Sequence, residues 1–390
     1  MTFAKFSFME EMKKYILGDV CSRLSSGKGI SSEEVFESGP YPVIGGNGLR
    51  GYSLRSNFSG ECGVIGRQGA YCGNVRFFSG EAYMTEHAVV VVGNEKADTR
   101  YLTYLLSTMH LGNLSAQSAQ PGLSVKTLAK QEIVLPSFPE QKKRASILAS
   151  LEDKIDLNNR INHNLEEQAQ ALYKSWFVDF EPFKGGKFVD SELGMIPEGW
   201  VCAPLASILE YRKKAVNPQK FPDTLFTHYS LPAYDNSREP ELQRGDEIMS
   251  NKFRLDNKMV LFSKLNPRIK RLWPIDAVAP DSICSTEFIA YKALKEQHHS
   301  FVWCYLNSDS FYEKVMAEVN GATGSHQRFH AVDTLDYIIP YNQIAISEFS
   351  EHATPILETI IKNERENRIL KKERNELLPR LMAGDISITC

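Results

Sequence analysis

Several features of secreted, membrane-bound and strongly basic proteins are missing from this sequence. Its 7 cysteines are scattered over 390 residues without a C-x-x-C pair, which argues against a structural zinc site or a disulfide framework. No stretch approaches the roughly 18 consecutive apolar residues that span a bilayer. The N-terminal segment MTFAKFSFMEEMKK has no apolar core of signal-peptide length. We therefore expect a protein of the reducing cytoplasm with no membrane association.

Recognisable catalytic motifs are also missing. Residues 26–29 (SGKG) resemble a phosphate-binding loop, but Ser22 stands where its first glycine belongs and Gly29 replaces the Ser or Thr. Residues 266–268 (NPR) lack the second proline and the aromatic residue of the N-P-P-aromatic motif of adenine methyltransferases. His298 and His299 have no metal-ligand spacing to other residues and are predicted to form a surface pair. We expect a chain that is not an enzyme by itself and holds no metal or cofactor.

The sequence does contain one long helical pattern that occurs twice. Apolar or small side chains recur in steps of three and four over residues 139–181, which predicts a long helix with Pro139 in its first turn. The seam positions are Leu148, Leu151, Ile155, Asn158, Asn162, Leu165, Ala169, Leu172 and Trp176. So narrow a seam is typical of a helix that packs against a partner helix, not of a helix lying on a core.

Adding 205 to each seam position gives the second copy of the pattern. Its positions are Ala353, Ile356, Ile360, Asn363, Asn367, Leu370, Arg374, Leu377 and Leu381. The two asparagines fall on two asparagines, and only Arg374 departs in character from its counterpart. We predict a second long helix over residues 343–390, in which Pro355 either introduces a kink or marks the true start.

The two helices are predicted to pair with each other, because an isolated seam would leave its leucines in water. An antiparallel pairing is favoured since a parallel one needs a long return path, although the parallel arrangement stays open. Buried asparagines in the seam would penalise a wrong register by leaving amides unpaired. The alternative for the asparagines is that they face solvent.

A globular region precedes each helix, at residues 1–138 and 200–342, and residues 182–199 are interpreted as a linker. Many of the 25 glycines cluster between Tyr41 and Gly80, which indicates a small, strongly curved β unit with tight turns. The predicted fold class is α+β: two mixed α/β regions separated by two long antiparallel helices in a coiled-coil-like pair with pseudo-two-fold symmetry. The helix copies are alike while the globular regions largely are not, so we expect one common frame that carries two different surfaces.

Positive charge is locally clustered although the net charge is -3. Seven cations and one acid lie between Lys252 and Arg271, and four arginines accompany one acid between Tyr41 and Gly80. Cations beside Asn, Gln, Ser and Tyr suit duplex DNA, since the charges hold phosphates while amides and guanidinium groups contact base edges. The candidate DNA-binding residues are Asn47, Arg50, Arg67, Gln68, Tyr71, Lys252, Arg254, Lys264, Asn266, Arg268, Lys270, Arg271, Gln327 and Arg328. The alternative interpretation is solvated turns with scattered salt bridges.

Six short segments, spread over nearly the whole chain, carry a resemblance to a known family. They are residues 120–124 (QPGLS), 135–141 (LPSFPEQ), 176–182 (WFVDFEP), 196–200 (IPEGW), 285–288 (STEF) and 377–384 (LLPRLMAG). With them the chain resembles the specificity (S) subunit of type I restriction–modification systems. The entry to the second helix, residues 339–343 (IPYNQ), departs from the usual Pro-rich, Glu-Gln start.

The resemblance implies two target-recognition domains, residues 1–138 and 200–342, each of which reads one half of a split, asymmetric DNA site. It implies that the helix pair sets the gap between the halves and docks two methyltransferase subunits that carry S-adenosylmethionine. It further implies restriction subunits that use ATP and Mg and join through the complex. The specificity subunit itself would be non-catalytic.

Two other classes of protein are weighed against this one. A protein–protein scaffold, with two adaptor regions on a helical rod and no nucleic acid, is disfavoured by the basic stretches. A free-standing nuclease or methyltransferase is disfavoured by the missing motifs.

Overall fold

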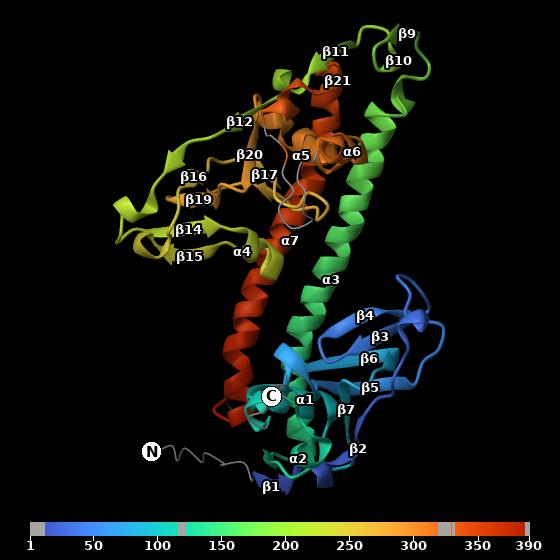
Figure 1. Cartoon of the computed structure of the whole chain (residues 1–390), viewed down its shortest axis with the longest axis vertical. Coiled ribbons are helices and arrows are strands. Elements are labelled where there is room, and N and C mark those ends of the chain that lie inside the picture. The colour runs from blue at the N-terminus through green and yellow to red at the C-terminus, as the bar shows by residue number, and fades with distance from the viewer. Residues whose placement is uncertain (1–11, 116–121, 319–328, 330–331, 387–390) are drawn as a thin grey trace, which may run out of the picture. The chain divides into compact units, whose positions relative to one another are not determined.

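The computed structural model describes residues 12–115, 122–318, 329 and 332–386 (Figure 1). Contacts divide the chain into two compact units: the first comprises Met1–Ile155 and Leu370–Cys390, and the second comprises Asp156–Ile369. Each of the two long helices, α3 (Phe138–Phe177) and α7 (Gln343–Ala383), contributes one part to each unit. Among the described residues, no helix is long and apolar enough to cross a membrane.

The first unit is built on a mixed sheet with strand order β2-β7-β5-β6-β3-β4, in which β3 and β6 pair in parallel (Figure 1). A separate antiparallel ladder joins β1 to β8. The strands are β1 (Lys13–Ile16), β2 (Cys21–Ser26), β3 (Tyr41–Gly45), β4 (Gly48–Ser53), β5 (Phe58–Gly66), β6 (Val75–Met84), β7 (Ala88–Gly93) and β8 (Glu132–Leu135). The helices are α1 (Thr99–Thr108), α2 (Val125–Ala129), η1 (Leu17–Val20), η2 (Ser32–Glu34), η3 (Gly69–Tyr71) and η4 (Leu111–Leu114).

The sequence explains the centre of this sheet. Strand β7 is a run of β-branched residues, and Val89, Val90 and Val91 are all buried, as in a strand covered on both faces. Helix α1 begins where the Asp98 carboxylate accepts a hydrogen bond from the Tyr101 N–H at 2.9 Å.

The second unit contains two larger sheets, with strand orders β12-β20-β17-β18 and β13-β16-β19-β14-β15. Two further pairs, β9 with β10 and β11 with β21, are antiparallel. The strands are β9 (Phe188–Ser191), β10 (Gly194–Pro197), β11 (Val201–Pro204), β12 (Leu209–Arg212), β13 (Ala215–Val216), β14 (Leu225–Tyr229), β15 (Glu241–Arg244), β16 (Lys252–Arg254), β17 (Met259–Ser263), β18 (Leu272–Ile275), β19 (Ser282–Ser285), β20 (Phe288–Ala293) and β21 (Ile338–Tyr341). The helices are α4 (Leu231–Ser237), α5 (His299–Asn307), α6 (Asp309–Ala317), η5 (Glu181–Phe183), η6 (Leu205–Ser207), η7 (Pro218–Lys220), η8 (Gly245–Glu247), η9 (Glu296–His298) and η10 (Asp333–Asp336).

The two globular regions share a core topology, which corrects the expectation that they are largely unlike. The order β12-β20-β17-β18 matches β2-β7-β5-β6, and a two-stranded ladder precedes each long helix in the same way. What repeats is the burial pattern: Leu17 and Leu205 are both 0% exposed and follow the first strand of each ladder. The repeat is not visible in the sequence at a single offset, because β11 follows β1 by 188 residues whereas α7 follows α3 by 205.

The differences between the regions are additions to this common core. The first region adds the β3–β4 hairpin at one edge of its sheet. The second adds the five-stranded sheet with α4. The expectation of two different surfaces therefore rests on these additions and on the loops of the shared core.

Within the second unit, α3 and α7 contact each other through the predicted asparagines. Asn158 Nδ2 donates to Asn367 Oδ1 at 2.9 Å, and Asn363 Nδ2 donates to Asn162 Oδ1 at 2.8 Å. As the residue number rises along one helix it falls along the other, so the contacting segments run antiparallel. The asparagines therefore bond to each other and do not face solvent.

Burial varies among the predicted seam positions. Those that are buried are Leu148, Ile155, Asn158, Asn162, Ala169, Ala353, Ile360, Asn367 and Leu381. Those that are half-buried are Leu151, Leu165, Leu172, Trp176, Ile356, Asn363, Leu370, Arg374 and Leu377.

The expectation of a narrow seam is wrong for the helix segments that also close a globular core. In the second unit, Tyr173 and Phe177 of α3 and Phe349 of α7 are buried with Phe301 of α5. The rings of Phe177 and Phe301 lie 4.9 Å apart, and those of Phe177 and Phe349 lie 5.2 Å apart. A helix that packs on both a partner helix and a sheet region buries a wider stripe than a seam.

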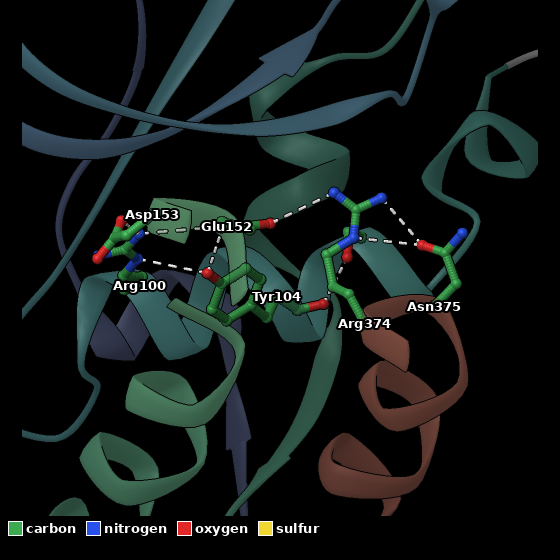
Figure 2. A network of polar contacts seen from close by, with 7 residues as sticks. Arg100, Tyr104, Glu152, Asp153, Arg374 and Asn375 are labelled. Atoms are coloured by element: carbon green, nitrogen blue, oxygen red, sulfur yellow. Dashed lines mark hydrogen bonds and ion pairs between the residues drawn. The ribbon is translucent and has the colours of Figure 1, made fainter. Parts of the chain in front are cut away.

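In the first unit a polar network joins α1 to both long helices (Figure 2). The Tyr104 hydroxyl donates to Glu152 Oε2 at 2.5 Å, and Arg374 Nη1 lies 3.8 Å from Glu152 Oε1. Arg100 Nη2 donates to Asp153 Oδ1 at 3.0 Å. Burial and the Glu152 carboxylate both raise the pKa of the Tyr104 phenol, so this hydroxyl stays a donor at neutral pH.

The observed helix ends differ from those predicted. Helix α3 ends at Phe177 instead of residue 181, and α7 ends at Ala383 before Gly384, whose φ of +83° is typical of a residue following a helix. Helix α7 begins at Gln343 and continues through Pro355, so this proline does not mark the start.

Two further expectations are wrong because the segments concerned are packed. Residues 182–199 form an ordered hairpin, and Ile196 is buried in the core of the second unit. His298 and His299 are each 5% exposed and not a surface pair. The His298 Nε2 atom lies 3.1 Å from Ser347 Oγ of α7, and the His299 Nε2 atom lies 3.3 Å from the Met259 carbonyl oxygen of β17. Both histidines are buried because α5 packs beside α7 and β17.

Candidate nucleic-acid interface

Two connecting loops in equivalent positions hold most of the predicted DNA-binding residues. The first connecting loop, residues 67–74 (RQGAYCGN), joins β5 to β6, and the second, residues 264–271 (KLNPRIKR), joins β17 to β18. Because β5–β6 and β17–β18 match in the shared topology, the loops are counterparts. Both have eight residues by these bounds.

The first connecting loop is closed by backbone hydrogen bonds at its base. The Gly66 N–H donates to the Asn74 carbonyl at 2.8 Å, and the Arg67 N–H donates to the His87 carbonyl at 3.0 Å. The second bond ties the first loop residue to the position just before β7. The loop is therefore anchored at its ends.

The second connecting loop repeats both bonds. The Ser263 N–H donates to the Arg271 carbonyl at 3.0 Å, and the Lys264 N–H donates to the Glu287 carbonyl at 3.0 Å. Glu287 stands just before β20, as His87 stands just before β7. The two loops are thus one structural element that occurs twice with different side chains.

The side chains of the first connecting loop are available to a ligand. Gln68 and Tyr71 are exposed, with Tyr71 at 49%, and Arg67 is half-buried. The turn between β3 and β4 brings Asn47, and β4 brings Arg50; both are exposed. Within the described parts of the chain, neither Arg50 nor Arg67 forms a salt bridge. The structure therefore gathers five of the predicted residues from two neighbouring segments.

The β3–β4 turn lies directly against the base of the first connecting loop. A Cβ on Gly46 would lie 3.2 Å from Gly66 Cα and 2.8 Å from the His87 carbonyl oxygen. Such close backbone contact needs glycine at both positions. The Gly-rich sequence of this region therefore permits the close packing of two loops, beyond the tight turns expected from the sequence.

In the second connecting loop, Lys264 and Arg268 remain free of salt bridges to described residues. Arg268 is exposed beside Ile269, which is 53% exposed, and Lys264 is half-buried. Asn266 adopts φ +48° and its Oδ1 atom is buried, so its amide does not face solvent freely. Of the predicted residues in this loop, Lys264 and Arg268 best fit a DNA contact.

The predicted role of Lys252 in DNA binding does not fit its burial. This residue is 6% exposed and lies on β16 in the other sheet, where its Nζ donates to Ser250 Oγ at 2.6 Å. Burial lowers the pKa of its ammonium group. Proximity in sequence to the second connecting loop is not proximity in the sheet.

Other cations of the predicted basic stretch have partners within the second unit. Arg254 Nη1 lies 2.9 Å from Asp281 Oδ1, and Arg271 donates twice to Asp235, at 2.6 and 2.9 Å. Lys270 donates to the carbonyl oxygen of Asn307, which leaves its charge in place. Two of these three charges are therefore paired with acids that are distant in sequence, and a DNA contact at all three residues stays a prediction.

The remaining predicted residues, Gln327 and Arg328, lie outside the described residues. Among the described residues no group of His, Cys, Asp or Glu could hold a metal ion.

A residue that the sequence did not single out for DNA binding lies at the first site. Arg76, on β6 just after the first connecting loop, donates from Nη1 to the Asn47 carbonyl oxygen at 2.6 Å.

A second residue that the sequence did not single out is Arg238, which lies 3.8 Å from Glu166 of α3 and 3.7 Å from Glu364 of α7 within the second unit. Burial raises the pKa of both glutamates, while the guanidinium opposes that shift. Neither contact has a signal in the sequence, since the partners are far apart along the chain.

Comparison with known proteins gives a consistent result. A family described as "Type I restriction modification DNA specificity domain" matches residues 9–167. The type I restriction enzyme MjaIX specificity subunit of Methanocaldococcus jannaschii is 29% identical over 318 residues, which cover 76% of this chain and 71% of that protein. The EcoprrI specificity subunit of Escherichia coli is 40% identical over 156 residues, 39% of this chain and 38% of that protein.

A solved structure shares the fold along the whole chain. The type I restriction–modification S subunit from M. genitalium superposes with a TM-score of 0.65 at 14% identity and covers 99% of both chains. The matched domain, the two relatives and the common fold agree with one another. Along most of its length the chain is therefore similar to the specificity subunits of type I restriction–modification systems, and residues 9–167 match their DNA specificity domain.

Proposed function

We propose that this chain reads a split DNA site, one half with each globular region, through the two connecting loops. The observation that carries the proposal is the equivalence of the loops: eight residues each, the same closing hydrogen bonds, and free cations in both. A duplicated recognition element with different side chains suits an asymmetric site whose halves differ in sequence. The chain recognises DNA and leaves the chemistry to other subunits.

The chemistry of the loops supports both parts of DNA recognition. Arg67, Lys264 and Arg268 carry charge that no described residue neutralises, so they can bind phosphates, and the two guanidinium groups can also donate to base edges. Gln68 and Asn47 bring amides and Tyr71 brings an aromatic hydroxyl, groups that contact base edges or sugars. We propose that affinity comes mainly from the cations and falls steeply with salt concentration.

The long helices are proposed to form an antiparallel, coiled-coil-like pair that spaces the two globular regions in a pseudo-two-fold arrangement. The hydrogen bonds between Asn158 and Asn367 and between Asn162 and Asn363 support this, because they fix one register. We propose that two methyltransferase subunits dock on this frame with S-adenosylmethionine. Restriction subunits that use ATP and Mg would join through the complex.

The test uses the full chain assembled with its methyltransferase subunits. Methylated sites are first mapped in cells, and binding is then measured on duplexes altered in one half-site at a time. Arg67→Ala should lose about 1–3 kcal/mol of discrimination in one half-site and leave the other unchanged, and Arg268→Ala should do the reverse.

Lys184→Ala provides the matched control, because Lys184 belongs to neither connecting loop and its charge is paired with Glu181 at 2.6 Å. This variant should keep both half-site preferences. If Arg67→Ala and Arg268→Ala both left the two preferences intact, the connecting loops would not be the recognition element. Equal weakening on all sequences would assign these residues to phosphates alone.

A further inference from the structure

The first site contains a hairpin turn that the second site lacks. Among the described residues, the β3–β4 hairpin has no counterpart beside the second connecting loop, since the four-stranded sheet of the second unit ends at β18. Its turn is held against the first connecting loop by the contact of Gly46 with Gly66. Asn47 stands at this turn with its side chain exposed.

Arg76 fixes the turn from the neighbouring strand. Its Nη1 donates to the Asn47 carbonyl oxygen at 2.6 Å, and its Nη2 lies 3.5 Å from Asn47 Oδ1. A Cβ on residue 48 would come within 2.2 Å of Arg76 Nη1, and Gly48 has a φ of +100°. The guanidinium therefore lies over a position that only glycine can occupy.

This contact determines which part of the Asn47 amide is free. A guanidinium group only donates hydrogen bonds, and its Nη2 lies nearest to the amide oxygen, which therefore faces Arg76. The Nδ2 group, with its two donors, makes no hydrogen bond to described residues. An asparagine that reads adenine presents its oxygen and its nitrogen side by side to the base, whereas here Arg76 stands beside the oxygen and leaves the Nδ2 donors as the more accessible part of the amide.

We infer that Asn47 determines specificity in the half-site read by the first region, as a donor to the paired acceptors of a guanine edge, and that Arg76 is the residue that positions it. The O6 and N7 atoms of guanine are both acceptors in the major groove, which matches the two donors of Nδ2. Arg76 acts through Asn47 and not on DNA. This inference rests on the function proposed above.

The experiment measures binding of the complex to duplexes that carry each base pair in turn at every position of that half-site. Asn47→Ala and Arg76→Ala should relax the preference at the same single base pair, each by roughly tenfold. The double variant should lose no more than either single one, because both act through one contact. Arg76→Lys, which keeps a donor for the Asn47 carbonyl oxygen, should retain part of the preference.

The salt dependence separates positioning from direct phosphate contact. If Arg76 only positions Asn47, the slope of log K against log salt should stay unchanged in Arg76→Ala. A fall of about 0.9 in that slope, with uniform weakening on all sequences, would make Arg76 a phosphate ligand and overturn the inference. Asn47→Asp keeps the oxygen for Arg76 but has no donor; preserved guanine preference in this variant would also overturn it.

Failure of this inference can be told from failure of the proposed function. Binding to the half-site of the second region serves as the internal reference for folding in every variant. If Arg67→Ala relaxes its half-site while the Asn47 and Arg76 variants do not, only the inference fails. If none of the three has an effect on that half-site, the proposed role of the first connecting loop fails as well.

Discussion

At the scale of single residues, burial decides which polar groups serve stability and which are available to DNA. Lys252 and Arg271 look like DNA ligands in the sequence but are held by Ser250 and Asp235. His299 looks like a surface residue but is the buried first residue of α5, with Lys258 and Asp276 as its charged neighbours. Burial lowers the pKa of its imidazole to about 4, whereas a free histidine titrates near 6.5.

This histidine should make the second unit sensitive to acid. The folded pKa lies below the unfolded one, so the unfolded chain takes up the proton first as the pH falls. The free energy of unfolding is therefore highest above pH 6.5 as far as His299 is concerned. It falls by roughly 3 kcal/mol as the pH drops from 6.5 to about 4.

Chemical unfolding followed by tryptophan fluorescence measures this effect, since all 4 tryptophans lie within the second unit, Asp156–Ile369. His299→Gln, which can still donate to the Met259 carbonyl oxygen, should show a flatter dependence on pH over that range. An equally steep loss of stability in the variant would place the acid-sensitive group elsewhere.

At the scale of elements, each globular region shares a buried apolar core with both long helices, but the side chains at the two attachments differ. In the first unit Leu148 and Leu381 enter the core, and the polar network of Tyr104, Glu152 and Arg374 is added to it (Figure 2). In the second unit the core around Phe177 and Phe349 is rich in aromatic rings. Between the helices, paired asparagines take the place of leucines, and buried amides of this kind favour one register over others.

The asparagine pair should behave as a coupled unit. Asn363→Ala leaves Asn162 Oδ1 without its donor at 2.8 Å, and Asn162→Ala leaves the donor without its acceptor. Each single variant should lower the free energy of unfolding by about 1–2 kcal/mol, and the double variant should lose less than the sum of both. The same fluorescence measurement reports it, and strict additivity would mean that the two amides are independent.

At the scale of the whole molecule, the proposed function makes the helices a spacer between half-sites. Matched deletion of residues 156–162 and 363–369 would remove seven residues, or about 10 Å, from each helix and keep the partners in step. The gap tolerated between half-sites should then shorten by about 3 base pairs, given 3.4 Å per base pair. Deletion in one helix alone should disrupt the pairing. An unchanged gap after matched deletion, measured by methylation of duplexes with varied gaps, would refute the spacer.

The long helices could be predicted from the sequence alone, because a seam of leucines and asparagines repeats within each helix and depends only on local spacing. The match of Asn158 and Asn162 with Asn363 and Asn367 was visible in the same pattern, and Arg67, Gln68 and Tyr71 lie together since they are neighbours along the chain. The similarity to specificity subunits could be anticipated from short segments such as residues 135–141 and 196–200.

Which charges are free, and the fact that the globular regions share a core, emerge only from the folded chain. Asp235 neutralises Arg271 and Asp281 neutralises Arg254 across distances in sequence that no local pattern records. Burial and backbone hydrogen bonds, such as those of the Arg67 and Lys264 N–H groups, hold the shared core in the same geometry in both regions. Backbone bonds do not depend on the identity of the side chains, so the side chains of the two regions can differ. For the same reason the contact of Arg76 with Asn47 has no sequence signal: two strands that are not adjacent along the chain create it by lying in one sheet.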